Sequence, residues 1–396
     1  MRIVGLDISK SSVSACLLEE KPSEPRQFYF DCRFEHFYAN ATGINALLAL
    51  KPDVAVMEPT GINYQRLWGT HLARAGIPVY LVGHSELKAY RKYLGFLDNK
   101  DDDADALALA CYWWDYYQSP RRFIQLRDYP ITRIRELVLR LAHLNRVQSP
   151  IINRLRQDLA WQFPEVALTQ SRREPLSQNL PLLWAWLAGE KRSIKYDNWL
   201  ANSIGLGITN TVKLHAERIC HLQREEIEIE RELIQLLNAV EFIPYRKTFA
   251  CFGFGLRLQA VLISQIYPLS NYLDADGNPE VIIRRGRKSG KPTKRYLSER
   301  RFMRSLGVAP GKDASGDKEL DRVGGSDLCR IALWQWVFTR IEVKRSRPKN
   351  EIGEHLGKIF DAEKASNRPI KLVRTRVAAR AVRLLFKRLV AALKSD

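Results

Sequence analysis

Residues 1–18 read MRIVGLDISKSSVSACLL, and this stretch indicates the first structural elements of the chain. Apolar residues recur through IVGLDI and again through VSACLL, which is typical of two β-strands joined by the turn SKSS. Asp7 stands near the end of the first of these runs. The stretch therefore predicts a pair of strands, the first of which carries a carboxylate at its end.

Strand-like and helix-like segments alternate beyond this pair. Two short apolar runs indicate further strands, at 53–58 and 77–82. Three segments between and after them have the composition of helices, at 62–75, 84–95 and 103–117. Strands that interleave with helices predict an α/β domain over about residues 1–125.

The rest of the chain is expected to be mainly helical. Residues 131–161 are amphipathic. Residues 210–240 carry a short heptad seam that predicts packing against another helix, of the same chain or of another copy. The seam consists of Ile219, Leu222, Glu226, Ile229, Leu233, Leu236 and Val240, with Glu226 as its one polar interruption. We therefore expect a helical, coiled-coil linker with a role in oligomerisation at 126–240 and a basic, mainly α-helical domain at 241–396.

Charge is distributed unevenly along the 396 residues, whose formal net charge is +19. Residues 1–130 hold 15 Lys/Arg against 16 Asp/Glu, whereas residues 241–396 hold 33 against 16. Such a skew favours a polyanionic partner, because Lys and Arg release counterions from phosphates when they bind. The alternative is a soluble basic protein without such a partner.

Cysteine usage and hydropathy exclude several classes. The six cysteines form no Cys-x-x-Cys pair, so neither a zinc finger nor a disulfide framework is expected. No stretch approaches 18 uninterrupted apolar residues, so we expect no membrane span. The N-terminus lacks the long apolar segment of a signal peptide, and an intracellular, cytoplasmic protein is expected.

Acid is concentrated in one stretch of this basic chain, LDNKDDDADALALA at 97–110. Asp102 and Asp105 are three residues apart, so on a helix they share one face. Asp7 and Glu58 each end a predicted strand, and the ends of neighbouring strands can converge. Four carboxylates are hard oxygen ligands that suit one or two Mg²⁺ or Mn²⁺ ions, which can assist the cleavage of a phosphodiester.

Other roles for these acids remain open on spacing alone. Asp101 and Asp103 are better explained as the cap and first turn of a helix, where the helix dipole favours negative charge. Asp98 could also share the face of Asp105. For Asp7 and Glu58 the alternative is an ordinary polar strand end.

Three motifs resemble one family in their order and spacing. GLDISK at 5–10, MEPTG at 57–61 and KDDDADA at 100–106 are similar to the N-terminal domain of the insertion-sequence one-ten recombinases, the DEDD transposases related to the Piv DNA invertases. The resemblance implies a ribonuclease H/RuvC-like fold for this domain. It also implies that Asp7, Glu58, Asp102 and Asp105 are the catalytic, metal-binding acids, with Lys100 opening the last motif.

The resemblance extends to LGVAPGKDASG at 306–316, within the C-terminal transposase domain of the family. There it implies that Ser315 is the nucleophile that forms a phosphoserine link with DNA. From the residues alone, Ser315 is a small residue on an expected flexible loop among cations, which would stabilise the transition state. Ser326 is the competing candidate, and an ordinary loop serine is the alternative.

Two glycines and two basic segments are further candidates for nucleic-acid contact. Gly253 and Gly255 precede a predicted helix and could offer backbone N–H groups to phosphate, although a plain helix-entry turn is equally consistent. Residues 284–304, an expected basic hairpin or loop, hold ten Lys/Arg and one acid, and residues 364–396 hold ten and one. The expected contacts are Arg284, Arg285, Arg287, Lys288, Lys291, Lys294, Arg295, Arg300, Arg301, Arg304, Lys312, Lys318, Arg322, Arg374 and Arg380.

The leading hypothesis is a DNA transposase that moves its own insertion sequence. The resemblance implies double-stranded donor and target DNA as substrates, a structured guide (bridge) RNA, and homodimers that pair into a tetramer at the nucleoid. The alternative is a metal-dependent RuvC-like nuclease or Holliday-junction resolvase that uses water and forms no covalent intermediate. A third possibility is a nucleic-acid-binding scaffold without activity.

Overall fold

The computed structural model describes all residues except 60, 97–100, 125–128, 287–289, 316–317 and 395–396. Side chains are described for the same residues apart from 61–63, 121, 129 and 310–323. The chain forms two compact units, Met1–Arg127 and Asp128–Asp396. No helix in the described residues is long and apolar enough to cross a membrane.

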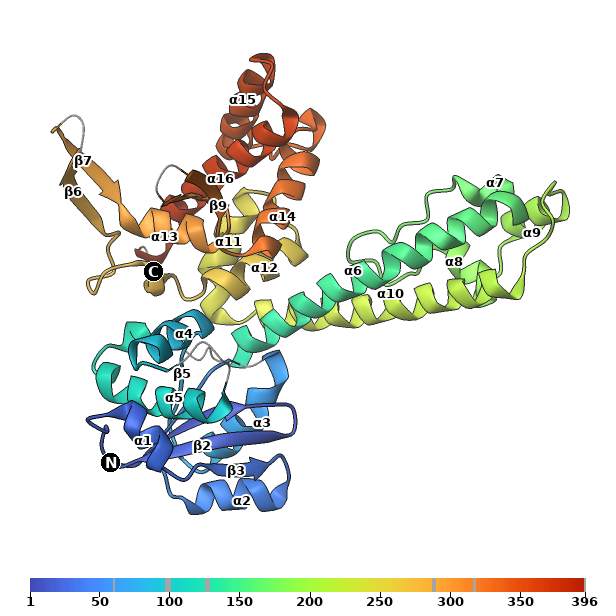
Figure 1. Ribbon diagram of the computed structural model, residues 1–396. Helices are drawn as coiled ribbons and strands as arrows, with labels where there is room; N and C mark the ends of the chain where they lie inside the picture. Colours follow the sequence, from blue (N-terminus) through green and yellow to red (C-terminus); the bar gives the residue numbers. More distant parts are fainter. Residues whose placement is uncertain (60, 97–100, 125–128, 287–289, 316–317, 395–396) are drawn as a thin grey trace. The chain divides into compact units, whose positions relative to one another are not determined.

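The first unit is built on a mixed sheet of five strands (Figure 1). Its strands are β1 (Ile3–Ile8), β2 (Ser12–Leu18), β3 (Glu35–Tyr38), β4 (Val54–Met57) and β5 (Val79–Leu81). Their order across the sheet is β3-β2-β1-β4-β5, and β1 runs antiparallel to β2 but parallel to β4. This is the strand order of the ribonuclease H fold, which confirms the predicted α/β, RNase H/RuvC-like class.

Helices cover both faces of this sheet. The helices are α1 (Pro25–Asp31), α2 (Ala41–Ala49), α3 (Gly61–Arg74), α4 (His84–Tyr93) and α5 (Asp102–Tyr116). One core joins Ile3 and Val56 to α4 and α5, and the other joins Val4 and Leu6 to α2 and α3. The faces alternate along β1 because successive side chains of a strand point to opposite sides.

The first part of the second unit is a pair of long helices, α6 (Tyr129–Gln162) and α10 (Asn210–Leu237), which pack side by side (Figure 1). The predicted partner of the heptad seam is therefore a helix of the same chain. Of the seam residues, Ile219, Ile229 and Leu233 are buried, whereas Val240 is exposed. Three short helices lie between the pair in sequence, α7 (Pro164–Ala167), α8 (Leu182–Leu187) and α9 (Ile194–Ala201).

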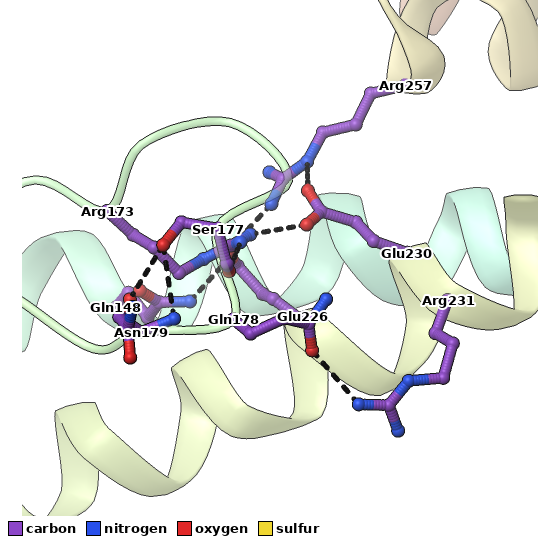
Figure 2. Close-up of polar contacts among 9 residues, drawn as sticks. All are labelled: Gln148, Arg173, Ser177, Gln178, Asn179, Glu226, Glu230, Arg231 and Arg257. Atoms are coloured by element: carbon purple, nitrogen blue, oxygen red, sulfur yellow. Dashed lines mark hydrogen bonds and ion pairs between the residues drawn. The ribbon is translucent and has the colours of Figure 1, made fainter.

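A buried ion-pair network holds the loop before α8 against α10 (Figure 2). Arg173 Nη2 lies 2.7 Å from Glu230 Oε2 and 3.5 Å from Glu226 Oε2. Arg257 pairs with the same two carboxylates, at 2.7 and 2.8 Å. Gln148 of α6 donates to Glu226 at 2.7 Å. Glu226, the polar interruption of the heptad seam, is therefore a buried member of this network.

The remainder of the second unit is mainly helical. Its helices are α11 (Ile243–Cys251), α12 (Leu256–Ile266), α13 (Leu297–Ser305), α14 (Asp327–Trp336), α15 (Glu351–Ala365) and α16 (Ile370–Lys394). Two hairpins are inserted, β6 (Val281–Arg285) with β7 (Pro292–Tyr296), and β8 (Pro310–Ser315) with β9 (Lys318–Val323). One core joins these helices to the first half of α6 and the second half of α10. The division of this unit at residue 240 stays a prediction.

Candidate active site

The close approach of α5 to β1 is the local feature on which the site depends. A Cβ atom at Gly5 would lie 2.0 Å from the carbonyl oxygen of Ala106 and 2.6 Å from the amide nitrogen of Ala110. Only glycine leaves room for the helix backbone at this distance. Residues two apart on a strand share a face, so Asp7 lies on the same side of β1 as Gly5, toward α5.

Glu58 reaches the same side of the sheet from the neighbouring strand. Leu6 of β1 pairs in register with Met57 of β4, so Asp7 and Glu58 occupy the next positions along parallel strands. Val54 and Val56 belong to the core beneath α5, and the period of two assigns Glu58 to that side as well. This register places the two strand-end carboxylates side by side, as expected from the sequence.

The acidic stretch begins α5, and its residues divide between capping and the site. Asp101 is the N-cap, and its side chain accepts a hydrogen bond from the amide of Asp103 at 3.1 Å. Asp103 lies toward the strands, 3.5 Å from His36 Nε2. Asp102 is exposed in the first turn and Asp105 is buried one turn later. The predicted capping role of Asp101 agrees with this geometry, while Asp98 lies outside the described residues.

Electrostatics connects the four acids. The pKa of Asp7 is raised to about 7, first by burial and then by the negative charges of Asp102, Asp105 and Glu58. A hydrogen bond between the side chains of Asp7 and Asp102 contributes to the same shift. Burial and nearby negative charges both disfavour the ionised form of a carboxyl. The raised pKa of Asp7 therefore indicates a partly dehydrated site in which several carboxylates lie close together.

Two basic side chains of α4 face these acids, and sequence reasoning missed both. Arg91 Nη1 lies 2.9 Å from Asp105 Oδ1, and both side chains are buried. His84 Nδ1 lies 2.9 Å from Glu58 Oε2. The two are seven residues apart on one helix and so share a face. This spacing was the available signal, but nothing local connects it with carboxylates on other elements.

The donor set fits a divalent cation. Among the described residues no three acidic, histidine or cysteine side chains are grouped as ligands of one ion would be. Asp105 and Glu58 are instead paired with Arg91 and His84. Four hard oxygen donors and the raised pKa of Asp7 nevertheless match Mg²⁺ or Mn²⁺, because a cation would relieve the repulsion that raises this pKa.

The candidate nucleophile lies in a hairpin rather than in the expected flexible loop. Ser315 is the last residue of β8 and pairs in register with Lys318, the first residue of β9. Hairpin pairing was missed because PGKDAS has little β propensity. Ser326 caps α14, where its hydroxyl accepts from the amide of Cys329 at 3.3 Å. The competing serine thus has a structural role, which favours Ser315.

The two candidate glycines stand where the sequence predicts a turn before a helix. Gly253 has a φ of +64°, in the left-handed region that favours glycine. Gly255 is the N-cap of α12, and a Cβ there would meet no atom within 4 Å. The turn is confirmed, and its contact with phosphate stays a prediction.

The candidate basic residues differ in their surroundings. Arg301 is paired with Glu280 at 2.7 Å. Arg374 donates to Glu342 at 2.6 Å and lies over the rings of Trp334 and Phe338. Arg287 and Lys288 lie outside the described residues, as do the side chains of Lys312, Lys318 and Arg322. Apart from Arg301, which is also exposed, the exposed members are Arg284, Arg285, Lys291, Lys294, Arg295, Arg300, Arg304 and Arg380.

One family model and one solved structure are similar to parts of the chain. Residues 4–164 match the family model DEDD_Tnp_IS110, described as a transposase. One solved structure that the chain is similar to is the RuvC structure of Thermus thermophilus, at 15% identity and a TM-score of 0.22, over 32% of this chain and 100% of that one. No curated protein matches the chain. Asp7, Glu58, Asp102 and Asp105 all fall in the matched segment, so the part of the chain that carries these acids is similar to the DEDD transposases of the IS110 type.

Proposed function

We propose that the protein is a DNA recombinase that cuts and rejoins DNA through a phosphoserine intermediate. The observation that carries the proposal is the convergence of Asp7, Glu58, Asp102 and Asp105 at one end of the sheet, within a segment that matches a transposase family model. Carboxylates in this arrangement suit the cleavage of a phosphodiester backbone.

The four acids would hold one or two Mg²⁺ or Mn²⁺ ions. Such ions supply charge neutralisation at the scissile phosphate when they are bound. Asp7 is held in the paired strand β1, Glu58 directly follows β4, and Asp105 lies in α5, so the protein presents these donors on or beside rigid elements. Asp102 is the exposed member and is accessible to substrate.

Ser315 would be the nucleophile. Its Oγ forms a bond to phosphorus, the bond from phosphorus to one sugar oxygen breaks, and the hydroxyl proton ends on that sugar oxygen. No water is consumed, so the energy of the phosphodiester is kept for rejoining. The acids and Ser315 belong to different compact units, and in the proposed dimer or tetramer each subunit contributes a copy of both units.

Donor and target duplexes are the proposed substrates, and a structured guide RNA is the proposed selector of both, acting in the cytoplasm at the nucleoid. The observation that favours nucleic-acid partners is the excess of 33 Lys/Arg over 16 Asp/Glu in residues 241–396. Sequencing the RNA that co-purifies with the protein tests the guide. A single abundant species would support it, and its absence would remove it.

A covalent trap tests the chemistry. The protein is incubated with duplex DNA of the element's ends and Mg²⁺, denatured, and separated by gel electrophoresis. The wild type should give a protein–DNA adduct, and Ser315→Ala should give none. Adduct formation by Ser315→Ala would refute the serine assignment. Cleavage by the wild type without any adduct would instead indicate a hydrolytic nuclease.

A matched pair of variants tests the acids. Asp102→Asn should abolish cleavage because it removes a metal-binding charge. Asp101→Asn removes the same charge one residue earlier and keeps the N-cap, since Asn caps helices as well as Asp. Cleavage should therefore survive in Asp101→Asn. Equal loss in both variants would contradict the assignment of Asp102.

A further inference from the structure

The hairpin β6–β7 contributes nothing to the hydrophobic cores of the described chain. None of its residues belongs to a buried cluster, and every residue of β6 is exposed. Figure 1 shows the ribbon extending away from α13. Isolated two-stranded ribbons are marginally stable in water, so an exposed ribbon of this kind is more easily explained by a binding role than by a role in folding.

The ribbon is strongly cationic. Residues 281–296 contain no Asp or Glu. Among the described residues, its exposed cations have no carboxylate within ion-pair distance, whereas nearby Arg301 is held by Glu280 at 2.7 Å. The cations concerned are Arg284, Arg285, Lys291, Lys294 and Arg295. Their charge is therefore available to a polyanion.

Apolar and basic side chains are combined on both faces of the ribbon. Ile282 pairs in register with Arg295, and Ile283 pairs with Lys294. Ile283 is 69% exposed, an unusual state for isoleucine on a strand. In a DNA groove, Arg and Lys bind guanine or phosphate, and apolar side chains contact the thymine methyl group. Both kinds of contact are available from each face.

The dimensions of the ribbon suit one kind of groove. Five residues of a strand span about 17 Å, and paired strands lie about 4.8 Å apart. The major groove of B-form DNA, about 12 Å wide and 8.5 Å deep, admits a two-stranded β-ribbon. The major groove of A-form RNA is too deep and narrow for side chains to read.

We propose that β6–β7 is a DNA-reading ribbon that enters the major groove of duplex DNA. This inference rests on the proposed function, because it assigns a reading element to the same DNA-binding protein. A second copy of the chain is a poorer partner, since its ribbon would bring the same unpaired cations together. Another protein that added a strand to the ribbon edge would bind through backbone hydrogen bonds and would leave the ribbon's own cationic side chains without anionic partners.

The test compares two double variants that lose the same charge. Arg284→Ala/Arg295→Ala removes two cations of one ribbon face, and Lys191→Ala/Arg192→Ala removes two exposed cations from the loop before α9. Binding to a 30-base-pair DNA duplex and to an RNA duplex of the same sequence is measured by fluorescence anisotropy over a range of KCl concentrations. Circular dichroism checks that both variants keep the fold.

The ribbon variant should bind duplex DNA about ten- to a hundredfold more weakly at 100 mM salt. Its slope of log K against log salt should become shallower by about 2, for two lost phosphate or base contacts. Dimethyl sulfate should regain access to guanine N7 in the major groove. The Lys191/Arg192 variant should match the wild type, and RNA binding should be equal in all three proteins.

The two hypotheses fail differently. Wild-type protein that binds no duplex DNA would refute the proposed function and the ribbon with it. Wild-type protein that binds DNA and forms the adduct, while the ribbon variant binds equally well, would refute the ribbon alone. A loss confined to the RNA duplex would refute the DNA assignment and indicate an RNA-binding ribbon.

Discussion

Replacing Arg173 by Met should destabilise the second unit far more than the loss of an exposed ion pair would. Arg173 and its partners Glu226 and Glu230 have side chains only 5%, 8% and 5% exposed. The guanidinium also donates to the carbonyl of Ser177 at 2.8 Å, which holds the loop before α8 (Figure 2). The variant therefore leaves two buried carboxylates with Arg257 as their remaining cation.

The magnitude follows from this change in charge. Two arginines and two glutamates balance in the wild type, and the variant leaves one net negative charge in a buried site. Removing one partner of a buried pair costs about 3–5 kcal/mol. Arg257 still contacts both glutamates, at 2.7 and 2.8 Å, so we expect the lower end, about 3 kcal/mol. Arg173→Met/Glu230→Leu should recover part of this cost, because it restores charge balance.

Arg231→Ala is the matched control, since Arg231 and its partner Glu228 are 51% and 65% exposed. An exposed pair contributes less than about 1 kcal/mol. Urea unfolding followed by helical circular dichroism measures the three variants against the wild type. If Arg173→Met lowers the free energy of unfolding no more than Arg231→Ala does, the conclusion that burial makes this ion-pair network strongly stabilising is refuted.

Three further outcomes are expected. Arg91→Met should lower the free energy of unfolding by about 3–5 kcal/mol in EDTA, because Asp105 loses its buried ion-pair partner. Added Mg²⁺ should restore part of this loss. An identical loss with and without Mg²⁺ would contradict a metal site at Asp105. Gly5→Ala should lower the free energy of unfolding by about 3 kcal/mol and reduce activity, because the added Cβ displaces α5. At Gly69 an added Cβ would meet no atom within 4 Å, so Gly69→Ala should leave stability in urea unfolding unchanged or raise it. Cys251 is exposed and should react with a thiol reagent at pH 8, while the four buried thiols should react only after unfolding; labelling of a buried thiol first would contradict the packing.

Local sequence signals were sufficient for most of the first unit. The strands β1, β2, β4 and β5 and the helices α3, α4 and α5 lie where hydrophobic runs and turn residues predict them. By contrast, α1, α2 and β3 were not predicted. β3 is the short strand EHFY, with one buried residue, so it carries almost no alternation. Its pairing with β2 decides its structure, and no local pattern encodes that contact.

The acids of the candidate site were predicted from local features of the sequence: their motifs resemble those of the DEDD transposases, and the helix period assigns Asp102 and Asp105 to one face. The surroundings of these acids follow from contacts between elements that are distant in the sequence. Arg91 and His84 face these acids through the packing of α4 beside α5, and Gly5 admits α5 because the helix backbone crosses that strand. Likewise, the sequence predicted a heptad seam, but folding decided that its partner is α6 and that Glu226 is neutralised by Arg173 and Arg257. Periodicity reports which side of an element is buried, whereas the identity of the partner depends on contacts between residues far apart in the chain.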